Sequence, residues 1–421
     1  MPSGGTEKGV FFRKPDHLFN DVTKRVIEIR LVKLAISWVD LSPITDKDER
    51  KADCKGGTGP VFWGLPRRRM ASPLQPIRNG GLAYVIIKGT SVWTDHMLNP
   101  KEFLQYFPSA VYSAARTVGG SNIFDWDSHM RRLAMLQRSH KPCSESAGGD
   151  KQPEKNNERV AQTKTEESSS HPLTTEEVEE LFLPAVRVGL TTFLRNNPEH
   201  EGKEMKVLFL LTEAEEGLLQ PWVHVHALPQ KDPEKFYAAC MYPAPLRSDP
   251  QLKSSAWLKA RQSYENLLQE GEEEGLMAHG EEGQLSEGLS SNVFVILKNG
   301  TIQTAPDDMV LKGTMRKLVI DTCTIHNIPL VQQAPTLSSA LDSWDSVFIT
   351  STTRIALPIG EIRVRDPPQA AAALSLPSLP LSAGHILRFD RSKQHLLLHT
   401  IYPTLLQLMQ ERARPVLPTS S

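Results

Sequence analysis

One carboxylate in this chain of 421 residues stands in a setting that favours chemistry. Glu287 lies in the Gly/Ser-rich run Ser286–Asn292, and the apolar run Val293–Leu297 follows at once. This apolar run and the Asn299-Gly300 pair after it predict a β-hairpin with an Asn-Gly turn. Glu287 is then held at the mouth of a sheet, where a buried carboxylate is costly unless a cation meets it. The alternative is an ordinary loop glutamate.

The residues from Glu287 to Phe294 read E-G-L-S-S-N-V-F. They resemble the signature E-G-x-x-S-N-hydrophobic-F of the class IV aminotransferases, the fold-type IV enzymes that use pyridoxal 5'-phosphate (PLP). That family includes branched-chain and D-amino-acid aminotransferases and aminodeoxychorismate lyases. The resemblance runs roughly from Gly81 to Ile362, and it is closest to a divergent D-amino-acid-aminotransferase-like branch found in plants. In the family this glutamate pairs with the ring nitrogen of the cofactor, so the resemblance implies that role for Glu287.

A lysine 34 positions before Glu287 is the candidate for covalent attachment of the cofactor. Lys253 precedes a predicted helix, and its separation from Glu287 is like that between the attachment lysine and the glutamate in the family. A protonated amine is a poor nucleophile, so desolvation or neighbouring charge must lower the pKa of this lysine. The alternatives are a surface lysine before a helix, and Lys259 on the same helix. Ala256-Trp257 stands where many members carry an Asn-Tyr pair.

A basic helix resembles the part of the family that grips the phosphate of PLP. His129–Leu133 reads H-M-R-R-L and resembles the family's H-x-x-R-L, which assigns Arg132 to phosphate binding. A guanidinium suits a bidentate grip on phosphate. The alternative is a solvated basic helix face.

A second phosphate segment is a predicted helix N-terminus. Leu311–Arg316 reads L-K-G-T-M-R and resembles the family's L-x-G-I/V-T-R. Gly313 allows close backbone approach, and the amides of Thr314 and Met315 can point at phosphate with the helix dipole behind them. Met315 stands where the family usually has Thr. The alternative is a plain glycine-containing turn before a helix.

A third segment is a strand end that opens into a hydroxyl-rich turn. Ile349–Arg354 reads I-T-S-T-T-R and resembles a Ser/Thr turn of the family whose hydroxyls and amides meet phosphate or substrate carboxylate. The resemblance assigns Ser351 and Thr352 to this contact. A Ser/Thr turn after a strand is common, and its place after Gly313 is what supports the assignment.

The rest of the chain must position these groups. Helix-like and strand-like segments alternate, which predicts α/β or α+β layers. The resemblance implies two domains, a smaller N-terminal two-layer α/β domain and a larger C-terminal α/β pseudo-barrel that binds PLP. We expect these domains at residues 81–228 and 234–414, joined by a linker at 229–233. We also expect a poorly ordered extension at 1–80, a disordered insertion rich in Ser, Glu, Lys and Gly at 141–174, and a tail at 415–421.

Hydrophobic periodicity predicts the individual elements. Strands are expected at Leu82–Ile87, Val111–Thr117, Lys206–Thr212, Trp222–Leu228, Phe236–Tyr242, Met277–His279, Leu330–Gln332 and Ser346–Thr350. Helices are expected at Asp127–Ser139, Thr174 to about Arg195, Lys253–Leu268, Thr314–His326, Leu337–Trp344 and Tyr402–Arg414, with a loop over 366–383.

Composition sets limits on function. The net charge of −1 favours neither nucleic acid nor an anionic membrane surface as a partner. No apolar run reaches the 18 residues of a membrane span. Four cysteines without C-x-x-C spacing favour reduced thiols and a cytoplasmic location, with an organellar address left open. His224 and His226 alternate along one strand without a third ligand at motif spacing, so no metal is expected.

The resemblance implies a PLP-dependent aminotransferase that exchanges an amino group between an amino acid and a 2-oxo acid. Lys253 would also move the Cα proton as general base and acid. A homodimer is implied because the partner completes the site in the family. Two alternatives stay open: a lyase of the aminodeoxychorismate type that releases pyruvate, and a PLP-binding scaffold that has lost catalysis.

Overall fold

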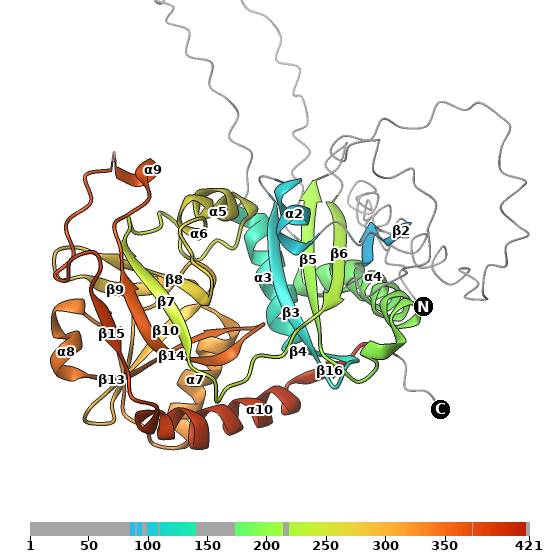
Figure 1. Cartoon of the computed structure of the whole chain (residues 1–421). Helices are drawn as coiled ribbons and strands as arrows, with labels where there is room; N and C mark the ends of the chain where they lie inside the picture. The colour runs from blue at the N-terminus through green and yellow to red at the C-terminus, as the bar shows by residue number, and fades with distance from the viewer. Residues whose placement is uncertain are drawn as a thin grey trace, which may run out of the picture. The chain divides into compact units, whose positions relative to one another are not determined.

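One sheet of the described chain is antiparallel throughout and is backed by two helices (Figure 1). Its strand order is β16-β4-β3-β5-β6-β1-β2. Helices α3 (Trp126–Ser139) and α4 (Thr175–Asn196) pack on one face. Thr174 caps α4, since its hydroxyl accepts from the amide of Glu177 while the Glu177 side chain accepts from the amide of Thr174. The strands are β1 (Val85–Lys88), β2 (Ser91–Thr94), β3 (Val111–Val118), β4 (Asn122–Phe124), β5 (Met205–Glu213), β6 (Leu219–Ala227) and β16 (Ala413–Pro415).

The alternation of side chains along β5 gives this sheet two distinct faces. Met205, Val207 and Phe209 belong to the core that the sheet shares with α3 and α4. Leu208 and Leu210 belong to a separate cluster on the opposite face, which also contains Tyr112 of β3. Only the first face is covered by the two long helices, so the second face is available to meet the rest of the molecule.

The second sheet closes on itself as a mixed barrel. Its order is β12-β11-β10-β13-β14-β7-β8-β9, and β9 pairs again with β10. The pairs β7–β8, β7–β14 and β11–β12 are parallel and the other pairs are antiparallel. The strands are β7 (Tyr237–Pro243), β8 (Glu272–His279), β9 (Gln284–Gly288), β10 (Asn292–Leu297), β11 (Ile302–Thr304), β12 (Leu330–Gln332), β13 (Trp344–Ser351), β14 (Ile355–Val364) and β15 (Ile386–Arg388).

Two helices pack against one side of the barrel wall. Helices α7 (Thr314–Ile325) and α10 (Tyr402–Glu411) bury their apolar faces on β10 and β13, where Phe294 and Phe348 stack with ring centroids 5.1 Å apart. Shorter helices are α2 (Pro100–Gln105), α5 (Ser255–Ala260), α6 (Gln262–Glu265), α8 (Ala340–Ser343) and α9 (Gln369–Ala372). The expected fold class, a smaller α/β layer and a larger C-terminal barrel, is confirmed.

This computed structural model describes residues 85–88, 91–94, 99–107, 110–139, 173–213, 219–372 and 374–417. All of them belong to the second of two compact units, residues 60–421. The extension expected at 1–80 lies outside the described residues, and so does the insertion at 141–174 except for Leu173 and Thr174. No helix in these described ranges is both long enough and apolar enough to cross a membrane.

Most of the predicted elements are present within a few residues, but several predictions were wrong. The helix expected at Lys253–Leu268 is two short helices, α5 and α6, and it starts two residues after Lys253. Glu287 lies in strand β9 and not in a turn. Strand β14 was missed because Pro358 and Gly360 interrupt the pattern of a strand. The terminal helix ends at Glu411, and the chain then forms β16 beside β4.

Two further elements differ from expectation. Residues 366–383 contain the single turn of α9, and β15 follows as an unpredicted third partner of β14. Both are short, and short elements carry too little periodicity to be recognised from sequence.

The Phe294–Phe348 stack makes a testable contribution to stability. Phe348 is fully buried between the barrel wall and α7. Phe348→Ala should lower the free energy of unfolding by about 3–5 kcal/mol, because it removes both buried area and the stacked neighbour. Urea unfolding followed by circular dichroism measures this loss. Phe348→Leu, which keeps most of the volume, should cost about 1.5 kcal/mol or less; equal losses for the two variants would contradict the packing argument.

Candidate active site

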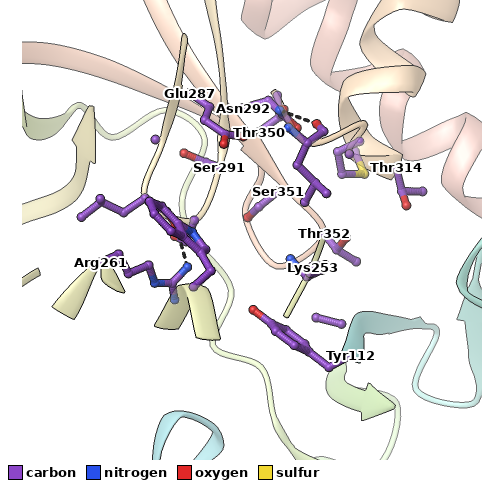
Figure 2. Close-up of a pocket in the computed structure, with 18 of the residues that line it drawn as sticks. Tyr112, Lys253, Arg261, Glu287, Ser291, Asn292, Thr314, Thr350, Ser351 and Thr352 are labelled. Atoms are coloured by element: carbon purple, nitrogen blue, oxygen red, sulfur yellow. Dashed lines mark hydrogen bonds between the residues drawn. The ribbon is translucent and has the colours of Figure 1, made fainter. Parts of the chain in front are cut away.

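A cleft of about 610 Å³, part of it open to solvent, lies between the second face of the antiparallel sheet and the barrel (Figure 2). The cleft brings together every residue that the sequence singled out for cofactor binding. These are Arg132, Lys253, Glu287, Gly313, Thr314, Met315, Ser351 and Thr352.

Lys253 is held in the cleft by its backbone. The amide of Tyr112 on β3 donates to the carbonyl of Lys253 (3.1 Å), and the amide of Ser255 donates to the carbonyl of Ala110 (3.0 Å). The Lys253 Nζ lies 5.2 Å from the centre of the Tyr112 ring. Burial lowers the pKa of Lys253 to about 7, and the charges of Arg132 and Arg261 add to the effect. A substantial fraction of this amine is therefore unprotonated, and nucleophilic, near neutral pH.

Glu287 has the cationic partner that its burial demands. Only 4% of the residue is exposed. Arg247 Nη1 donates to Glu287 Oε1 (2.8 Å), and the amide of Leu311 donates to Oε2 (3.0 Å). Burial raises the pKa of Glu287, while Arg247 and the Leu311 amide oppose the rise. The buried carboxylate faces the cleft with two donors already directed at it.

Arg247 was missed by the sequence reasoning. It lies six residues before Lys253, where no motif marks it. Its guanidinium also donates to the carbonyl of Leu252 (2.8 Å) and lies 4.6 Å from the centre of the Trp257 ring. Trp257, a departure from the family pattern, thus packs against the arginine that pairs with Glu287. The indole Nε1 donates to the carbonyl of Leu289 (3.1 Å), which joins this group to the turn after Glu287.

The N-terminus of α7 forms one end of the cleft. Gly313 occupies its N-cap, and no side chain caps the helix. A Cβ on Gly313 would lie 2.2 Å from Oδ1 of Asn292, so a larger residue here would have to displace the Asn292 amide, which is bonded to Leu311. Asn292 Nδ2 donates to the carbonyl of Leu311 (2.8 Å), and Arg132 Nη2 donates to that of Lys312 (2.9 Å). Free helix amides and a guanidinium therefore converge in a space shaped to receive an anion.

Hydroxyl groups line the cleft between Lys253 and Gly313. Ser351 Oγ lies 3.2 Å from Oγ1 of Thr353 and accepts from the amide of Arg354 (3.2 Å), which tightens the turn after β13. The hydroxyls of Ser291 and Thr350 are buried without a hydrogen-bond partner in the described part of the chain. Both residues line the cleft, so their hydroxyls are free to bond a molecule bound there.

The remaining sequence candidates do not assemble into a metal site. His224 and His226 lie on β6 with ring centroids 5.5 Å apart. No group of three or more His, Cys, Asp or Glu suited to a metal ion occurs within the described ranges. Lys259, the alternative attachment residue, is exposed on α5 and does not line the cleft.

The lowered pKa of Lys253 predicts how its amine reacts. Trace labelling with acetic anhydride should modify Lys253 with a half-maximal pH of about 7, because only the unprotonated amine reacts. Mass spectrometry of digested samples taken across pH 5–10 measures the profile, and the exposed Lys259 serves as internal reference. A Lys253 profile that follows that of Lys259 over the whole pH range would contradict the assignment.

Comparison with known proteins finds similarity to one protein family over part of the chain. Residues 184–362 match the model for amino-transferase class IV. The chain is 27% identical over 109 residues to a probable branched-chain-amino-acid aminotransferase of Aquifex aeolicus, a match that covers 26% of this chain and 35% of the relative. It is 37% identical over 82 residues to the D-alanine aminotransferase of Bacillus licheniformis, which covers 19% and 28%. The chain thus matches about a third of the length of these relatives.

Two solved structures share the fold. A branched-chain aminotransferase of Thermoproteus uzoniensis with norvaline superposes with a TM-score of 0.50 at 16% identity, covering 79% of this chain and 99% of that one. A hypothetical aminotransferase from Mycobacterium tuberculosis in its apo form gives 0.51 at 12% identity, covering 78% and 98%. Residues 184–362 are therefore similar to the class IV aminotransferase model, and the described chain shares its fold with these two structures.

Proposed function

We propose that this chain is a PLP-dependent aminotransferase that moves an amino group between an amino acid and a 2-oxo acid. One observation carries the proposal. An amine of lowered pKa, Lys253, and a buried carboxylate, Glu287, line the same cleft as the uncapped N-terminus of α7. These are an attachment point, a partner for a ring nitrogen and an anion site, which are the groups that PLP requires of a protein.

The donor set fits the cofactor at its phosphate end. Arg132 and the amides of Thr314 and Met315 would hold the phosphate, since they converge beside Gly313, where a Cβ has no room. The Met315 side chain is buried in the apolar cluster behind the helix, so its backbone amide and not its side chain serves the anion. Ser351 and Thr352 offer further hydroxyls, together with the unpartnered Thr350.

The other residues act on protons and charge. When bound, PLP supplies a ring that accepts the electrons released at the substrate Cα. Glu287 would keep a proton on the ring nitrogen, and Arg247 would keep Glu287 ionised. Lys253 Nζ would take the Cα proton and return it, because its lowered pKa suits both directions near neutral pH.

Transamination is favoured over the lyase alternative by the relatives, since both curated relatives named above are called aminotransferases. Amination of a 2-oxo acid by the purified protein, without release of pyruvate, distinguishes an aminotransferase from a lyase.

The narrower placement beside plant D-amino-acid-aminotransferase-like proteins rests on Ala256-Trp257, and turnover of D- but not L-amino acids would support it. The homodimer is also a proposal, and measurement of the mass of the protein in solution tests it. The cytoplasmic location is a further proposal, and imaging of the tagged full chain tests it.

Covalent attachment at Lys253 is the first test. Purified protein incubated with PLP should show the near-ultraviolet and visible absorbance of lysine-bound cofactor, and sodium borohydride should fix the cofactor on the peptide that contains Lys253. Lys253→Ala should abolish the fixed label, because the buried amine is gone, while Lys259→Ala should retain it. Absence of both the absorbance and the labelled peptide in the parent protein would remove the proposed function.

The variant Glu287→Gln distinguishes a role of Glu287 in turnover from a role in cofactor binding. The amide has the same shape but no charge, so it cannot stabilise a protonated ring nitrogen. Turnover should fall on the order of 10²–10³-fold, while absorbance still shows bound cofactor. Glu281→Gln, an exposed glutamate in the turn before β9, is the matched control and should leave turnover unchanged. A Glu287→Gln protein as fast as the parent would contradict the assigned role.

A further inference from the structure

One side chain joins the segment that carries Lys253 to the loop before α7. Gln251 Nε2 donates to the carbonyl of Asp307 (2.5 Å) and to that of Val310 (2.8 Å). An amide nitrogen carries two donors, so both are used. Within the described ranges, neither carbonyl accepts a hydrogen bond from another group. Gln251 is half-buried and is not among the residues that line the cleft, so it acts through these two segments and not by touching a bound molecule.

The Gln251 end of this bridge is fixed to the lysine. Asp249 Oδ1 accepts from the amides of Gln251 (3.1 Å) and Leu252 (3.2 Å), which closes a tight turn just before the lysine. The carbonyl of Lys253 accepts in turn from the amide of Tyr112 on β3 (3.1 Å). A displacement of Gln251 would therefore displace the backbone of Lys253 as well.

The loop end of the bridge is fixed to α7. Arg316 lies in the first turn of that helix and is buried. Its Nη1 donates to Oδ1 of Asp307 (2.6 Å), and its Nη2 donates to the carbonyl of Ala305 (2.8 Å). The loop is thus bonded to the first turn of α7, where the proposed phosphate site lies, and Gln251 is bonded to the loop.

We propose that Gln251 is a positioning residue that sets the distance between the Lys253 amine and the phosphate site at the N-terminus of α7. This inference rests on the proposed function. PLP would be held at two points, its aldehyde carbon at Lys253 and its phosphate at α7. It gains the full strength of both contacts only if their separation matches the cofactor. A compound held at Lys253 alone needs no such match, so the bridge at Gln251 favours the phosphorylated form of the cofactor.

Binding of PLP and of pyridoxal, which lacks the phosphate, tests this without turnover. The full chain, freed of cofactor, is titrated with each compound, and absorbance measures the lysine-bound form. Gln251→Met has a side chain of similar length without a donor, so PLP binding should weaken about tenfold, the scale of a lost hydrogen bond. Pyridoxal binding should not change, because Arg247 still pairs with Glu287 at the ring end. Gln262→Met, an exposed glutamine at the start of α6, is the matched control and should bind both compounds as the parent does.

A second variant tests the distance itself. Gln251→Asn keeps both donors on a side chain one carbon shorter, so it must lose the bonds or move the loop, and it too should weaken PLP binding alone. Circular dichroism shows whether each variant is folded. Equal weakening of PLP and pyridoxal in the folded variants, or no change with either compound, would overturn the role of Gln251 alone. A parent protein that binds neither compound at Lys253 would overturn the proposed function and this inference with it.

Discussion

The burial of one negative charge organises this active-site region. Glu287 is almost inaccessible to solvent, and a carboxylate in that position must be paired. Arg247 supplies the charge and the Leu311 amide supplies the second bond. Because Leu311 precedes Gly313 by two residues, the bond that satisfies Glu287 also fixes the backbone leading to the anion site. Removing the charge at Glu287 would leave Arg247 half-buried and unpaired, so the ion pair constrains both ends of the cleft.

Arg247 links this pair to the chain around Lys253. Its guanidinium bonds the carbonyl of Leu252, the residue before Lys253, and packs on Trp257 of α5. Trp257 and Arg261 both donate to the carbonyl of Leu289, two residues after Glu287. The segment around Lys253 and the turn after Glu287 are thus joined through Arg247, Trp257 and Arg261. A tryptophan in place of the family's tyrosine is therefore compatible with an ordered site, since its ring and its donor are both engaged.

The residues that the sequence singled out do line one cleft, but the sequence did not indicate the contacts between them. Glu287, Lys253, Gly313 and Ser351 are recognisable because each stands in a local pattern whose spacing survives without the fold. Arg247 and Tyr112 have no such pattern. Tyr112 faces Lys253 only because β3 bonds to a segment about 140 residues later in the chain, and no local rule reports a contact of that range. Strand β9 escaped detection for the opposite reason, because its Ser and Gly residues read as a turn until pairing with β8 and β10 extends them.

The charges of the cleft also explain how the pKa of one lysine can be lowered in a protein that carries almost no net charge. Arg132, Arg261, Lys206 and Arg247 all lower the pKa of Lys253 by repulsion, in addition to its burial. An anion bound beside Arg132 would weaken that repulsion and raise the pKa of Lys253 again. In the proposed function, the basicity of Lys253 would therefore depend on whether an anion occupies the site beside Arg132.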